Sequence, residues 1–177
     1  MTPEEFDQYA LSPENTDKIL ELIVGHVHEK PLNAYASKCA VHWIRYIGNF
    51  VDDHDLGHVT GEAGGYQIGF GERYAPDVAF VSKDKQAEVA TSGYNDVPPD
   101  LAVEVEFPSD LASEKRLRYK VTNYLNVGTV VWVVYPETKT VEIYAPGQSV
   151  QFLSEKDTLT GGDVLKGFSV PLSEVFK

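Results

Sequence analysis

The chain of 177 residues has 27 acidic and 15 basic side chains, and its formal net charge of −12 repels nucleic acid at long range. A polyanion could be contacted only through a local basic patch or a bound cation. Hydrophobic residues make up 42% of the chain, which excludes disorder, while the longest apolar run, VGTVVWVVY, is too short to span a bilayer.

The single cysteine, Cys39, excludes an internal disulfide framework and a CxxC zinc site. The first residues, MTPEEFDQYA, are acidic where a secretory signal would be basic and then apolar. We therefore expect one folded domain over residues 1–177, located in the cytoplasm, with no membrane partner.

The first half of the chain predicts a helix between short strands. SPENTDKILELIVGHVHEKP predicts a turn or short helix and then one strand through Leu22, Val24 and Val27. In NAYASKCAVHWIRYIGNFV the apolar residues recur at steps of three and four, which predicts an amphipathic helix capped by Asn33. Residues 51–76, rich in Asp, His, Gly and Glu, predict short strands joined by glycine turns.

The second half predicts a crossover. DVAFVSKDK predicts a strand that begins at Asp77, and PPDLAVEVEF predicts the next strand. A helix follows, capped by Ser109 or Asp110 and ended by Gly128, and then VVWVVYP predicts a strand covered on both faces. TKTVEIYAPG predicts its hairpin partner, and GGDVLKGFSVPLSEVF a last strand with a short helix. This order indicates an α/β fold, a mixed β-sheet flanked by helices, with an additional N-terminal and central β-meander.

Two acids alternate along PPDLAVEVEFPSD, so that Glu104 and Glu106 lie on one face of the strand. Asp77 lies at the mouth of the preceding strand, so neighbouring strands would bring Asp77 and Glu104 together. Mg²⁺ takes oxygen ligands and usually only one or two protein carboxylates. The backbone carbonyl of Val105 is a candidate third ligand, and Glu106 a candidate auxiliary one.

The helix after this strand presents a lysine beside its apolar stripe. Lys120 lies roughly 60–70° from the centre of the stripe, close enough to lean over the sheet. An ammonium there could orient a water molecule or offset charge on a phosphate. The stripe consists of Leu117, Val121, Tyr124 and Leu125, and the remaining basic residues, Lys115, Arg116 and Arg118, fall towards solvent.

Five segments together carry a family resemblance: ELIVGHV, APDVAFV, PPDLAVEVEFPSD, KVTNYLNVGTVVWVVYP and GFSVPLSEVF. With them the chain resembles the Uma-two family of restriction-endonuclease-like nucleases, a branch of the PD-(D/E)XK nuclease superfamily. The resemblance implies a restriction-endonuclease-like core and Mg²⁺-dependent phosphodiester hydrolysis, with Mn²⁺ as a substitute for Mg²⁺.

Position by position, the resemblance makes Asp77 the acid of the PD element and Glu104 the acid of the (D/E)XK element. Glu106 occupies the place of that element's lysine, and Lys120, with Tyr124 four residues later, matches a lysine that has moved to the helix. Glu21 is a candidate for a further metal-ligating carboxylate.

Simpler interpretations stand beside these. Without the family, Glu104 and Glu106 would be the solvated face of a half-exposed strand, Asp77 a turn residue, and Lys120 a side chain that covers the core and reaches water.

The predicted function is a Mg²⁺-dependent endonuclease that acts on nucleic acid, with DNA as the favoured substrate, and that forms a homodimer to cut both strands. The alternatives are an inactive nuclease-like fold that binds or regulates, and hydrolysis of another phosphodiester.

Overall fold

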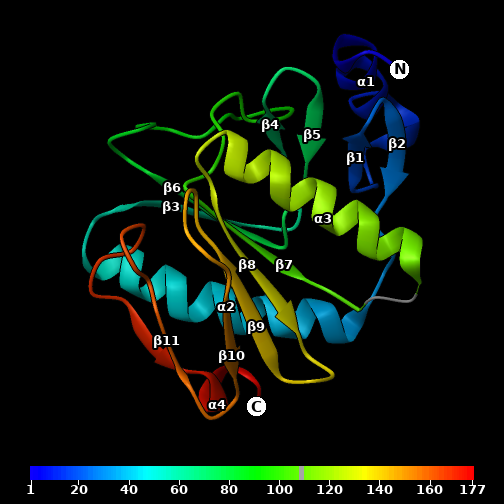
Figure 1. Ribbon diagram of the computed structural model, residues 1–177. Helices are drawn as coiled ribbons and strands as arrows, with labels where there is room; N and C mark the ends of the chain where they lie inside the picture. The colour runs from blue at the N-terminus through cyan, green and yellow to red at the C-terminus, as the bar shows by residue number, and fades with distance from the viewer. Residues whose placement is uncertain (108–109) are drawn as a thin grey trace.

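A six-stranded sheet forms the centre of the protein in the computed structural model (Figure 1), which describes residues 1–107 and 110–177. Its strand order is β10, β9, β8, β7, β6, β3, and neighbours run antiparallel except for β7 and β8. The parallel pair is joined by a helical crossover, as the sequence predicts. The strands are β3 (Gly57–Gly61), β6 (Val78–Ser82), β7 (Leu101–Val105), β8 (Val130–Tyr135), β9 (Thr140–Tyr144) and β10 (Gln151–Ser154).

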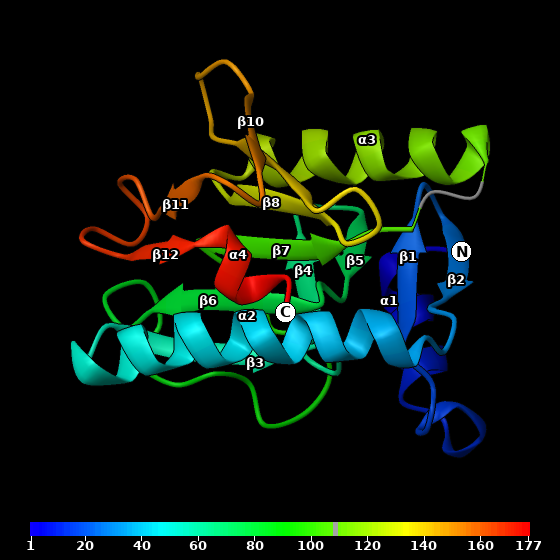
Figure 2. The same cartoon turned by 90° about the horizontal axis from the view of Figure 1, so that it is seen from below.

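The two long helices cover opposite faces of this sheet, as Figure 2 shows edge-on: α2 (Ala34–Asp53) on one side and α3 (Leu111–Asn126) on the other. Alternation along the strands divides the core accordingly. In β7, Val103 and Val105 pack on the α2 side, whereas Ala102 packs with α3. A side chain at position 104 therefore faces α3.

A smaller four-stranded sheet in the order β2, β1, β5, β4 stands beside one end of the large one. It consists of β1 (Leu20–Ile23), β2 (His26–Glu29), β4 (Tyr66–Ile68) and β5 (Glu72–Tyr74), preceded by α1 (Pro3–Ala10) and a 3₁₀ turn (Pro13–Asn15). Near the C-terminus, β11 (Thr158–Thr160) pairs with β12 (Ser169–Pro171), and the short α4 (Leu172–Val175) contacts α2.

Most sequence predictions for these elements are confirmed. The Asn33 carboxamide accepts from the N–H groups of Tyr35 and Ala36 and so caps α2. Asp110 caps α3, while Ser109, the other candidate, lies outside the described residues. The strand predicted to begin at Asp77 begins one residue later, at Val78. The mixed sheet flanked by helices is the predicted fold class.

The single strand predicted through Leu22, Val24 and Val27 is wrong, because the segment folds into the hairpin β1–β2. Its turn consists of Val24 and Gly25, with φ of 52° and 74°. A β-branched residue at positive φ is rare, since its side chain crowds the backbone, so the sequence carries no ordinary turn signal here. The N–H of Val24 is held by both carboxylate oxygens of Glu72, at 3.2 Å each.

Candidate active site

Asp77 and Glu104 lie opposite each other when the register of two adjacent strands is continued by one residue: Glu104 belongs to β7, and Asp77 directly precedes β6. The register of β6 and β7 pairs Val78 with Val103, and one further step pairs Asp77 with Glu104. Cβ atoms of directly opposed residues lie about 4.5–5.5 Å apart, and their side chains share a face of the sheet. The two acids are therefore neighbours, although 26 residues separate them in the chain.

The Asp77 carboxylate is bonded at both oxygens. Oδ2 accepts from the N–H of Val105 at 2.6 Å, and Oδ1 contacts the Lys30 ammonium at 2.7 Å. The residue opposite Val105 in the extended register is Pro76, which has no N–H to donate. Because N–H and C=O of one strand residue point to the same edge, the Val105 carbonyl points towards Pro76 and receives no ladder bond from it.

Glu104 is 1% exposed, so the interpretation of this residue as part of a solvated face is wrong. Its Oε1 lies 2.9 Å from the Lys120 ammonium and accepts from the Tyr124 hydroxyl at 3.0 Å. Burial raises the pKa of Glu104, and although Lys120 and Lys30 lower it, the result is a pKa of about 7. In the absence of metal, this carboxyl therefore binds a proton near neutral pH.

Lys120 joins the two sheets. Its ammonium lies 2.9 Å from Glu21 Oε1 in β1 as well as 2.9 Å from Glu104 Oε1 in β7, and its side chain is 5% exposed. It lies 5.4 Å from the centre of the Tyr74 ring. Burial lowers the pKa of Lys120, but Glu104 and Glu21 outweigh burial and raise it. The alternative in which this side chain reaches water is wrong.

Glu21 is positioned by the backbone as well as by Lys120. Its Oε1 accepts from the N–H of Ala75 at 2.9 Å. Burial raises the pKa of Glu21, yet Lys120 and Lys30 lower it below its ordinary value. Two buried carboxylates thus share one ammonium, which lowers the pKa of Glu21, while burial keeps the pKa of Glu104 raised.

Glu106 faces the same side as Glu104 and is half-buried. Burial raises its pKa, while Lys120 lowers it. Across the described residues, its side chain makes no hydrogen bond or ion pair. Glu106 is a nearby negative charge rather than a fixed member of the ion-pair network.

Sequence reasoning missed Lys30 and Tyr74. Lys30 follows β2, and its backbone N–H bonds to the carbonyl of Ile19, one step beyond the pair of Leu20 and Glu29. This register places Lys30 on the same face of the hairpin as Glu21, which pairs with His28. A predicted β1–β2 hairpin would have placed Lys30 beside Glu21. The hairpin was not predicted, because its turn, Val24 and Gly25, has no ordinary turn sequence.

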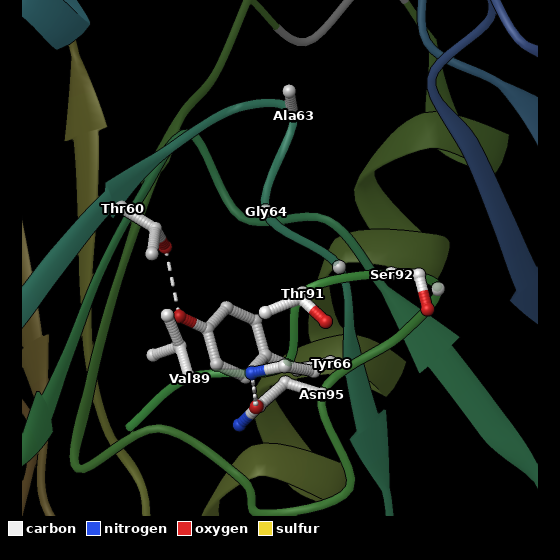
Figure 3. Close-up of a pocket in the computed structure, with 11 residues that line it drawn as sticks. Thr60, Ala63, Gly64, Tyr66, Val89, Thr91, Ser92 and Asn95 are labelled. Carbon is white, nitrogen blue, oxygen red and sulfur yellow. Dashed lines mark hydrogen bonds between the residues drawn. The ribbon is translucent and has the colours of Figure 1, made fainter. Parts of the chain in front are cut away.

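Two hollows lie on either side of the turn Gly61–Gly64. One, of about 320 Å³, lies between α2 and this turn and is lined by Asp77 together with Ser37, Val41 and Ile44. The other, of about 290 Å³, is lined by neutral residues from two loops, with Tyr66 bonded to Thr60 at 2.8 Å (Figure 3). Of the candidate acids, only Asp77 lines either of these two hollows, and it lines the first.

The available donors fit a hard cation. Four carboxylates, at residues 21, 77, 104 and 106, face two ammoniums, Lys30 and Lys120, which leaves a formal charge of −2 when all are ionised. In residues 1–107 and 110–177, no group of three or more His, Cys, Asp or Glu side chains is placed to hold a metal ion. Two carboxylates with a backbone carbonyl match the usage of Mg²⁺, which keeps its remaining positions for water and phosphate.

Within residues 1–107 and 110–177, no helix has the length and apolar character needed to cross a membrane.

Comparisons with known proteins identify the fold and the family of the chain. A solved structure described as a putative nuclease belonging to DUF820, from Anabaena variabilis ATCC 29413, superposes with a TM-score of 0.81 at 18% sequence identity, covering 99% of this chain and 97% of the other. At that identity the likeness concerns the fold. No curated protein matches the chain. The family model of Uma2, described as "Putative restriction endonuclease", matches residues 3–173, a span that includes both acids and both lysines, and the chain therefore belongs to the Uma2 family.

Proposed function

We propose that the protein is a metal-dependent endonuclease that hydrolyses phosphodiester bonds of nucleic acid, with DNA as the favoured substrate. The observation that carries this proposal is the opposed pair of Asp77 and Glu104, with the Lys120 ammonium 2.9 Å from Glu104. Membership of a restriction endonuclease family supports the same chemistry.

Asp77, Glu104 and the carbonyl of Val105 would hold Mg²⁺ or Mn²⁺. Such an ion, when bound, polarises a phosphate and lowers the pKa of a water molecule. The remaining steps belong to the chain itself. Lys120 holds a positive charge beside the place where negative charge develops on phosphate, and the Tyr124 hydroxyl fixes the Glu104 carboxylate.

Glu21 acts on Lys120 rather than on substrate. It accepts from Ala75 N–H and from the lysine through the same oxygen, Oε1, so it fixes the position of the ammonium. Glu106 supplies an auxiliary negative charge beside the acids. Its half-buried carboxylate offers an extra oxygen to a cation without being committed to another partner among the described residues.

A duplex has two strands of opposite direction, so its cleavage calls for two sites related by symmetry. We therefore propose a homodimer as the active form. With a single, buried cysteine, the chain suits the reducing cytoplasm.

Cleavage of supercoiled plasmid, single-stranded DNA and RNA in Mg²⁺ or Mn²⁺ tests the proposal. Asp77→Asn, Glu104→Gln and Lys120→Met should each abolish cutting, and chelation should abolish it in the parent. Asp84→Asn and Glu88→Gln, changes at exposed positions of equal charge, should cut normally. Cutting that survives the three site substitutions would refute the assignment, and cutting of RNA alone would refute DNA as substrate.

One observation favours a second candidate, a nuclease-like fold that binds or regulates without cutting. Asp77 and Glu104 are already paired with Lys30 and Lys120, so the network is complete without metal. In that case calorimetry should detect no Mg²⁺ binding, and Asp77→Asn should leave the titration unchanged. Binding of Mg²⁺ that Asp77→Asn removes would exclude this second candidate.

A further inference from the structure

Lys30 occupies the oxygen of Asp77 that a metal ion would need. Its ammonium lies 2.7 Å from Asp77 Oδ1 and 2.9 Å from the Ala75 carbonyl. The other oxygen, Oδ2, is bonded to the N–H of Val105, which belongs to the backbone of the sheet and stays in place. A divalent cation that binds Asp77 therefore meets the lysine first.

Lys30 is also the partner of Asp77 that can leave. Its side chain is 20% exposed, whereas Lys120 is 5% exposed and bonded to two buried carboxylates. Lys30 comes from the hairpin β1–β2 of the smaller sheet, outside the strands that carry the acids. A lysine side chain is long and flexible, and the Ala75 carbonyl offers its ammonium a second partner when the carboxylate is taken.

The pairing has a physical reason. Asp77 is buried, and a buried carboxylate with no partner is strongly destabilising. The acids of a metal site face this problem whenever metal is absent. An ammonium from the chain solves it, at the expense of competing with the ion for the same oxygen.

We propose that Lys30 is an internal competitor for the divalent metal: it holds Asp77 in the metal-free protein, leaves when the cation binds, and thereby weakens the metal affinity of the site. This inference rests on the proposed function, because it takes Asp77 as a metal ligand. Lys30 would thus influence the site through its contact with Asp77, in addition to the acids and Lys120. The metal concentration would decide whether Asp77 holds the lysine or the cation.

Calorimetric titration with Mn²⁺ tests the inference without any nucleic acid. Lys30→Met should bind Mn²⁺ roughly tenfold or more tightly than the parent, since a neighbouring charge changes a carboxylate's affinity for a proton by about one to three powers of ten. Lys83→Met is the matched control: it removes an equal charge from an exposed pair with Asp55, and its affinity should equal that of the parent.

Thermal melting gives a second readout. Without metal, Lys30→Met should melt below the parent, because Asp77 is left unpaired, and Mn²⁺ should raise its melting temperature more than it raises that of the parent. If Lys30→Met does not fold without metal, Lys30→Gln keeps a neutral donor at the position and should show the same tighter binding.

The outcomes separate the inference from the proposed function. If the parent binds Mn²⁺ through Asp77, as judged by loss of binding in Asp77→Asn, but the Lys30 variants bind no more tightly than Lys83→Met, the inference is overturned and the metal centre stands. If neither the parent nor any Lys30 variant binds Mn²⁺, both are overturned. Tighter binding by the Lys30 variants alone supports the inference.

Discussion

Replacing Glu104 with glutamine should change the pH dependence of folding stability. Burial, opposed by Lys120 and Lys30, raises the pKa of Glu104 from 4.5 to about 7. Between these values the folded protein holds a proton that the unfolded chain releases, so the stability of the parent falls as pH rises. Glutamine has the shape of the protonated acid and does not titrate. The free energy of unfolding of the variant should therefore increase relative to that of the parent as the pH rises.

The size of this change in stability follows from the interval between the ordinary and the raised pKa of Glu104. About 2.5 pH units at about 1.36 kcal/mol per unit amount to about 3.4 kcal/mol in the difference between the two free energies of unfolding. Because the sequence pI is 4.7, solubility restricts the measurement to about pH 5.5 and above. Between about pH 5.5 and 7 the difference should grow by about 2 kcal/mol and then level off.

Urea unfolding with a metal chelator present, followed by the fluorescence of the buried Trp43 and Trp132, measures this difference at each pH. Glu88→Gln, at an exposed position, should differ from the parent by a constant amount. A difference for Glu104→Gln that is flat across this range, or that shrinks with rising pH, would show that Glu104 is ionised throughout. The conclusion that burial raises the pKa of Glu104 would then be wrong.

Two further predictions concern the backbone, and equilibrium unfolding measures both. Val24 has φ of 52° and is exposed, so Val24→Asn should stabilise the hairpin by about 1 kcal/mol; a loss of stability would mean that the turn carries no strain. Gly57→Ala should destabilise by about 3 kcal/mol, because its new Cβ would lie 2.1 Å from a carbonyl of β6, whereas Gly48→Ala, in open space on α2, should stabilise by about 0.5–1 kcal/mol. Equal effects of the two glycine substitutions would contradict this reading of the backbone.

The sequence predicted the acid pair because strand periodicity and chain order are sufficient to find it. Alternation placed Glu104 on a defined face, and consecutive strands usually pair, which brought Asp77 alongside. The helix stripe located Lys120 for a similar reason, since 3.6-residue periodicity fixes the angle of each side chain. Periodicity did not predict whether Glu104 is buried, because the same alternating pattern fits a face exposed to solvent and a face covered by α3.

The rest of the site could not be predicted because it depends on an unusual turn. Val24 adopts positive φ, which its own side chain disfavours, and the conformation is held by Glu72 from a distant strand. Local sequence therefore gave no reason to break the first strand into a hairpin. Without the hairpin, Lys30 had no place near Asp77, and Glu21 could be connected to the site only through the family resemblance.

The hairpin β1–β2 carries Glu21 and, at its end, Lys30, while Glu104 belongs to β7 of the large sheet and Asp77 directly precedes β6. One short, contiguous segment of chain thus contributes a partner of Lys120 and the proposed competitor for metal. If the site binds metal as proposed, exchange of that segment between relatives would alter its metal affinity in one step and leave the register of β6 and β7 intact. The metal concentration that the site needs would then change in evolution independently of the residues proposed to carry out the chemistry.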